Sequence, residues 1–299
     1  MKPIFILFAG DGSSKLWWEY SEVTKTSILP KLDFVKQLKK IGKVYSFTSN
    51  FWNINYYETN PNKKERVRWN KIYKKYKPHS SNINFNLEDL NDDIICKKIY
   101  TIVRKKYGNK IKLIPVGHSS GAGIALLFSK MYKKECLCTI SIDMGPKHTQ
   151  KGYNEKLKDI RKKDGKMIKR YFNNNENLHK IINKIKNSLI TKKNVNKEID
   201  MIYKLIIYKY TSYRVKFFDK KLSVPTLFFR NIYHNNVSKK VDKRINDTAL
   251  EEIKEIKKNN KSSMYKHIYF LNGQHHIWYD QENSDEMIRQ IKCFQNVIF

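Results

Sequence analysis

Acidic residues, cysteines and long hydrophobic runs are scarce in this sequence, and each scarcity excludes a class of protein. Only 28 of the 299 residues are Asp or Glu, against 60 Lys and Arg. The four cysteines show no CxxC spacing, which predicts reduced core thiols rather than a disulfide scaffold. No run of about eighteen apolar residues occurs, so the sequence predicts no membrane-spanning helix.

Secretion and metal-binding signals are missing as well. The apolar run at the amino terminus stops at Gly10, which is too short for a signal sequence, so we expect a cytoplasmic protein. Neither a His-Glu-x-x-His pattern nor Cys/His ligand spacing occurs. We therefore predict no metal and no cofactor.

The net charge of +32 is the most unusual property of the composition. Residues 145–222 carry 22 basic and 7 acidic residues, a net charge of +15. Such a surface attracts anionic membranes and phosphate backbones, although a coding bias toward Lys, Asn and Ile is the favoured explanation of the charge. Arg-rich segments with interleaved aromatics are absent, so we expect weak association with anionic membrane surfaces and no specific nucleic-acid binding.

Strand and helix patterns alternate along most of the chain. Strands are predicted over 3–9, 43–48, 110–116, 136–142, 225–229 and 267–271, and helices over 28–41, 87–107, 120–130, 247–258 and 284–295. Continuous apolar strands and βαβ alternation indicate an α/β fold with a mostly parallel central sheet flanked by helices. The basic segment 145–222 is helical in pattern, so we predict a cap or lid there, inserted between core segments 1–144 and 223–299.

One motif carries specific chemistry. Gly117-His118-Ser119-Ser120-Gly121 directly follows a predicted strand and opens a predicted helix. A sharp strand-to-helix turn needs glycines on either side of the serine to avoid clashes while it lifts the hydroxyl out of the sheet. This G-x-S-x-G pattern in its proper context predicts that Ser119 is a nucleophile.

At these residues the chain resembles the α/β-hydrolase family, and the resemblance covers nearly all of it. Phe8 to Ser14 (FAGDGSS) is similar to the family's oxyanion loop, usually His-Gly-x-Gly, with Ala9 in place of the His. The resemblance implies that the backbone N–H groups of Asp11 and Ser120 form the oxyanion hole. It also implies that His118 is a packing residue.

The resemblance places the general base in the loop after the last strand. There the chain has Asn272-Gly273-Gln274-His275-His276, which is similar to the family's Gly-x-His pattern and favours His275 over His276. A serine hydroxyl is a poor nucleophile at neutral pH, so a base of this kind is required.

The acid is the least obvious member of the implied triad. Most relatives carry it after the next-to-last strand, where this chain has residues 230–235 (RNIYHN) and no carboxylate. A subset of the family carries the acid at the end of the strand after the nucleophile helix, where this chain has Asp143. We therefore predict Asp143, although many hydrolases have an Asp there that only shapes the turn.

The resemblance implies a serine esterase, lipase or thioesterase that acts on a small acyl ester or lipid-like substrate through an acyl-Ser119 intermediate. The missing carboxylate and the Ala9 substitution keep an alternative open: a degenerate relative that binds a small molecule or an anionic surface without turnover. The elbow, the oxyanion-like loop and the His after the last strand occur together, so the hydrolase is the leading prediction.

Overall fold

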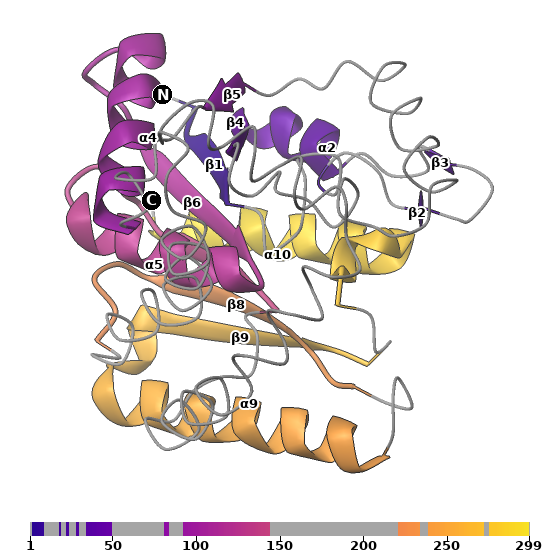
Figure 1. Cartoon of the computed structure of the whole chain (residues 1–299). Coiled ribbons are helices and arrows are strands. Elements are labelled where there is room, and N and C mark those ends of the chain that lie inside the picture. The colour runs from indigo at the N-terminus through magenta and orange to yellow at the C-terminus, as the bar shows by residue number, and fades with distance from the viewer. Residues whose placement is uncertain are drawn as a thin grey trace, which may run out of the picture.

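Strands and helices alternate along the chain, and most of the strands join one sheet (Figure 1). The computed structural model describes residues 2–8, 18, 22–23, 28–29, 34–49, 81–83, 92–143, 221–233, 239–271 and 275–298. The predicted cap over 145–222 lies outside these ranges apart from its last two residues. Among the helices within them, none is long and apolar enough to cross a bilayer.

Within the described ranges, seven strands form one sheet in the order β5-β4-β1-β6-β7-β8-β9, and all neighbouring strands are parallel. They are β1 (Ile4–Phe8), β4 (Lys43–Ser49), β5 (Ser81–Ile83), β6 (Leu113–His118), β7 (Thr139–Ile142), β8 (Thr226–Asn231) and β9 (Tyr265–Phe270). A separate antiparallel pair joins β2 (Glu22–Val23) to β3 (Ile28–Leu29). The strand order reverses beside β1, and ligands of such sheets bind at the carboxyl ends of the strands near that point.

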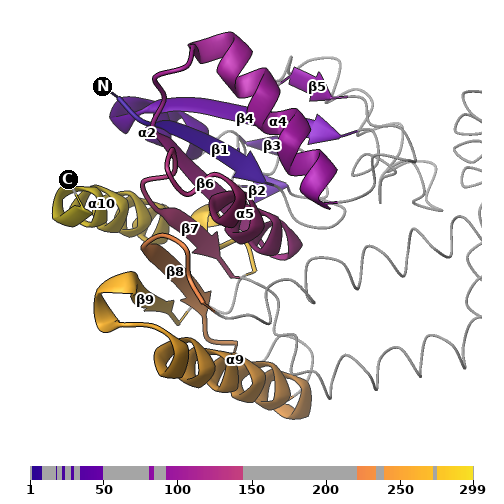
Figure 2. The same cartoon turned by 90° about the vertical axis from the view of Figure 1, so that its left-hand side faces the viewer.

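Helices cover both faces of the sheet. They are α2 (Phe34–Ile41), α4 (Asp92–Tyr107), α5 (Ser120–Met131), α9 (Lys239–Asn259) and α10 (Gln281–Ile298), with the short 3-10 helices η2 (Ser262–Met264) and η3 (Ile277–Tyr279). Figure 2 shows α10 and α5 on opposite sides of the strands. The result is the three-layer arrangement that the alternation predicts.

Strand β1 explains why a parallel sheet needs both layers. Phe5 and Leu7 pack in a cluster with α2 and α10, whereas Ile4, Ile6 and Phe8 pack in a second cluster with α4 and α5. All five side chains are buried. Because successive side chains of a strand point to opposite faces, a continuous apolar run is the pattern of a strand covered on both sides.

Two kinds of expectation from the sequence are wrong in detail, the helix starts and the cysteines, and the helix predicted over 247–258 begins at Lys239. The helix predicted from Ile28 begins at Phe34, and Ile28–Leu29 instead forms β3. Leu29 precedes Pro30, and the proline ring disfavours helical geometry in the residue before it. The second error concerns the cysteines: three of the four are buried, but Cys293 is exposed on α10 and is not a core thiol.

Candidate active site

Ser119 lies between the carboxyl end of β6 and the first turn of α5, in an unusual backbone conformation. Its φ of 53° and ψ of −121° lie where side chains with a Cβ are rarely found. Gly117 makes this turn possible, because a Cβ there would lie 2.3 Å from the carbonyl oxygen of Gly121 and 2.4 Å from Cα of Ala122. Strain of this kind is typical of functional positions.

The hydrogen-bond ladder of the sheet continues past the strand ends and places the next site residues in register. The Ser119 N–H donates to the Ile142 carbonyl at 3.0 Å, and the Asp143 N–H donates to the Phe229 carbonyl at 2.8 Å. Ser119 and Asp143 therefore extend from the ends of adjacent strands, β6 and β7. Parallel strands bring both to the same edge of the sheet.

Asp143 is buried, and its carboxylate is fully engaged. It has a φ of 40°, the second positive φ of a non-glycine residue among the described ranges. Oδ1 accepts the backbone N–H of Asn231 at 3.2 Å, and Oδ2 accepts the hydroxyl of Tyr233 in a very short contact. Oδ2 also lies 2.6 Å from Nδ1 of His275. The structure thus brings Asp143 to His275, as the sequence predicts.

This pairing fixes the protonation pattern of His275. The carboxylate can only accept, so Nδ1 carries the proton that it shares with Asp143, and Nε2 is left as the basic nitrogen. The His275 side chain is 39% exposed and that of Asp143 only 5%, so the imidazole is accessible while its partner is withdrawn from solvent. The arrangement suits a general base held by a buried acid.

His118 packs beneath the base, in agreement with the role implied for it. Its ring lies edge-on to those of Trp18 and Trp278, which stack on each other at 4.7 Å. Nε2–H donates to the backbone carbonyl of His275 at 3.0 Å. Burial, together with the neighbouring His275 and His276, lowers the pKa of His118 well below its ordinary value. It is therefore a neutral residue that anchors the backbone of His275.

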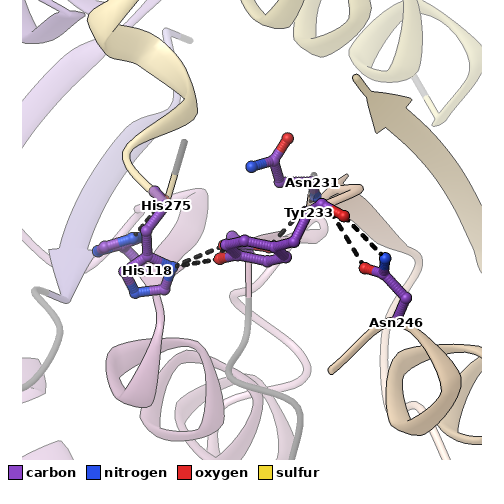
Figure 3. A network of polar contacts seen from close by, with 6 residues as sticks. His118, Asn231, Tyr233, Asn246 and His275 are labelled. Atoms are coloured by element: carbon purple, nitrogen blue, oxygen red, sulfur yellow. Dashed lines mark hydrogen bonds and ion pairs between the residues drawn. The ribbon is translucent and has the colours of Figure 1, made fainter. Parts of the chain in front are cut away.

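Two residues of this network were not predicted from the sequence. Tyr233 follows β8, and its hydroxyl lies 3.0 Å from His275 Nδ1 as well as against Asp143 (Figure 3). Asn246 of α9 binds the backbone of Tyr233 through both its amide oxygen and its amide nitrogen. The only signal in the sequence is indirect: the loop that lacks the expected carboxylate is the loop that holds Tyr233.

The implied oxyanion hole is only partly described. Asp11 lies outside the described residues. Ser120 is the first residue of α5, and the backbone N–H groups of a helix's first turn lack intrahelical partners. Gly121 is buried in the same turn.

Over the ranges that the structure describes, no group of three His, Cys, Asp or Glu side chains could hold a metal ion.

Comparison with known proteins gives structural matches alone. No protein-family model and no curated protein sequence matches the chain. MenH from S. aureus matches with a TM-score of 0.54 and 12% identity over 100% of this chain and 95% of that one. A thermophilic esterase from Thermogutta terrifontis (TM-score 0.49, 11% identity) covers 99% of this chain and 90% of its own, and a marine microorganism esterase (0.47, 15%) covers 98% and 95%.

At such low identity a structural match establishes the fold alone. The likeness to MenH, the all-parallel strand order and the strand-to-helix turn at Ser119 agree with one architecture. The chain has the α/β-hydrolase fold, as the sequence predicts.

Proposed function

We propose that this protein is a serine hydrolase that cleaves an ester or thioester through an acyl-Ser119 intermediate. One observation carries the proposal: the 2.6 Å pair between Asp143 and His275 stands at the same sheet edge as the strained turn that bears Ser119. A nucleophile, a base and an orienting acid in this order along the chain are the parts that acyl transfer requires.

The proposed reaction has two halves. In the first, Nε2 of His275 takes the hydroxyl proton as the Ser119 oxygen attacks the acyl carbon, and the protonated imidazole then gives that proton to the departing alcohol or thiol. In the second, Nε2 takes a proton from water as the water oxygen attacks the acyl carbon. The bond between that carbon and the Ser119 oxygen then breaks, the imidazolium returns the proton to the Ser119 oxygen, and the acid leaves. Asp143 stabilises the imidazolium formed in each half.

Negative charge on the acyl oxygen needs donors. The Ser120 N–H at the start of α5 is one candidate, and we assign the Asp11 N–H as the second by resemblance of its loop to the family pattern. A serine nucleophile with a His–Asp pair favours acyl esters and thioesters, and we propose a small acyl ester or lipid-like molecule as substrate.

Labelling with a fluorophosphonate tests the nucleophile directly. Attack by the Ser119 oxygen on phosphorus forms the P–O bond, fluoride leaves, and His275 accepts the hydroxyl proton. The wild-type protein should gain one phosphonyl group by intact mass, and Ser119→Ala should gain none. Ser263→Ala, which removes an exposed hydroxyl on η2, is the matched control and should label like the wild type.

The alternative function has its own outcome in this experiment. A folded wild-type protein that takes up no phosphonyl group would refute the hydrolase proposal and support a protein that binds its ligand without turnover. Labelling that survives in Ser119→Ala would place the nucleophile elsewhere. If the wild type labels, a series of p-nitrophenyl esters and acyl thioesters of rising chain length would define the substrate class.

A further inference from the structure

A third polar side chain contacts the pair formed by Asp143 and His275, and the proposed reaction does not use it. The Tyr233 hydroxyl contacts Asp143 Oδ2 and lies 3.0 Å from His275 Nδ1, so the phenol stands at the junction of acid and base (Figure 3). The three residues come from three loops, after β7, β8 and β9. The Tyr233 hydroxyl thus contacts both Asp143 and His275, and this double contact calls for a physical explanation.

The positions of the protons define what Tyr233 does. The Nδ1 proton of His275 is shared with Oδ2 of Asp143, and a carboxylate oxygen can accept a second bond, so the phenol donates its proton to the same Oδ2. Oδ1 accepts the backbone N–H of Asn231. Three donors from three directions therefore prevent the carboxylate from rotating away from the imidazole.

Tyr233 is itself held on both sides of its backbone. Its N–H donates to Asn246 Oδ1 at 3.1 Å, and its carbonyl accepts from Asn246 Nδ2 at 3.0 Å. The preceding residue, Ile232, donates its N–H to the Phe270 carbonyl at 2.8 Å. These bonds tie the loop to α9 and to β9, so the backbone that carries the phenol is held rigidly.

We propose that Tyr233 is a positioning residue that acts through Asp143 on His275, an inference that rests on the proposed function. The acid of this protein extends from β7, and the loop after β8 contributes hydrogen-bond donors to it instead of a carboxylate of its own. Asn231 at the end of β8 and Tyr233 in the following loop both donate to Asp143 and hold Oδ2 against Nδ1 of His275. Without the phenol, Oδ2 loses a charge-assisted hydrogen bond and its fixed orientation.

The first test is the rate of fluorophosphonate labelling in Tyr233→Phe, measured over a range of probe concentrations. We expect the maximal rate to fall about ten-fold, as for loss of one hydrogen bond to a charged group, with an unchanged half-saturating concentration. Tyr100→Phe is the matched control, because it removes a phenol that donates to the Glu135 carboxylate at 3.0 Å far from the site. The control should label at the wild-type rate.

A double-mutant cycle separates positioning from a general loss of stability. If Tyr233 acts through Asp143, Tyr233→Phe should cost little or nothing in an Asp143→Ala background. An equal loss in both backgrounds, or a wild-type rate in Tyr233→Phe itself, would overturn the inference.

Proton NMR provides a readout that needs no turnover. The Nδ1 proton of His275 in its short bond to Asp143 should give a far-downfield resonance that Asp143→Ala abolishes and Tyr233→Phe shifts. A resonance unmoved by Tyr233→Phe refutes the positioning role even if the wild type labels. If Tyr233→Phe shifts the resonance but the wild-type protein is never labelled, the hydrolase proposal is refuted and the positioning contact stands.

Discussion

The turn that carries Ser119 and the pair formed by Asp143 and His275 are built in opposite ways. The turn is one continuous stretch between Gly117 and Gly121, and its geometry is local. The pair joins residues 132 positions apart, and a third element supplies the donors that hold it. Both lie at the same edge of the sheet because the strands are parallel.

This difference teaches where each part is vulnerable. A local turn depends on the backbone freedom of one or two residues, so one substitution should break it completely. An assembled pair depends on several contacts, each of which contributes a share, so its substitutions should give graded losses. Substitutions in each region therefore test the contrast, and the local turn should show the largest effect.

Substitution of Gly117 should have the largest effect. The methyl group of Gly117→Ala would overlap backbone atoms of the next turn at 2.3–2.6 Å, which costs about 3 kcal/mol or more and displaces Ser119. We expect a lower melting temperature and no fluorophosphonate labelling of the fraction that folds. Gly108→Ala is the control: its φ of 91° costs about 1–2 kcal/mol but the site nearby is open, so its folded fraction should label normally.

Asp143→Asn should lower the labelling rate by about 10³- to 10⁴-fold while the fold persists. The amide nitrogen would donate to Nδ1, which forces the proton onto Nε2 and removes the base. Asp247→Asn, at an exposed position of α9, is the matched control for loss of one negative charge. A rate within about three-fold of the wild type in Asp143→Asn would show that another residue is the acid.

Acid pH should destabilise the protein through three histidines that are wholly or partly withdrawn from solvent, namely His118, His267 and His276. Burial lowers the pKa of His276 to about 3, that of His267 to about 4, and that of His118 as well. The unfolded chain binds protons below its ordinary histidine pKa of about 6.5, whereas the folded protein does not, so stability present above pH 6.5 is lost as the pH falls.

Each of these histidines adds up to about 1.4 kcal/mol per pH unit to the slope of the unfolding free energy. Urea unfolding of the wild type and of His276→Gln between pH 7 and pH 5 measures this slope. The variant should lose one histidine's share. An identical slope would mean that His276 titrates normally in the folded protein.

The smallest effect is expected for Asn246, which touches the pair only through the backbone of Tyr233. Asn246→Ala should reduce the maximal labelling rate about three-fold, because the phenol keeps its contacts while the backbone of Tyr233 loses its two hydrogen bonds to Asn246. Asn260→Ala removes a similar bond to the Leu222 N–H at the far end of α9 and should leave the rate unchanged. Equal labelling rates in Asn246→Ala and Asn260→Ala would show that Asn246 does not support Tyr233.

The sequence predicts those parts of the molecule that depend on short-range pattern. The apolar strands, the helix α5 and the turn at Ser119 each follow from residues within about ten positions of one another. The sheet edge that gathers Asp143 and His275 then follows from parallel pairing, once each is placed after a strand. The helix start at Phe34 is missed because Pro30 interrupts an apolar pattern that otherwise continues.

Tyr233 and Asn246 could not be predicted, for a different physical reason. Neither belongs to a motif, and a tyrosine in a polar loop has no periodicity that marks it. Their contacts exist only because β8 brings Tyr233 to Asp143, 90 residues away along the chain, and α9 brings Asn246 to Tyr233, 13 residues away. Such contacts depend on the register of the whole sheet and leave no local pattern.

The positive φ of Ser119 implies a conflict between the thermal stability of the protein and the presence of a hydroxyl at this position. Only glycine adopts such a backbone without cost, so Ser119→Gly should relieve about 1–3 kcal/mol of strain and raise the melting temperature. A selection for thermal tolerance alone would favour that change and discard the hydroxyl. Under the proposed function the cost of this backbone is offset by the hydroxyl, because the hydroxyl is the nucleophile.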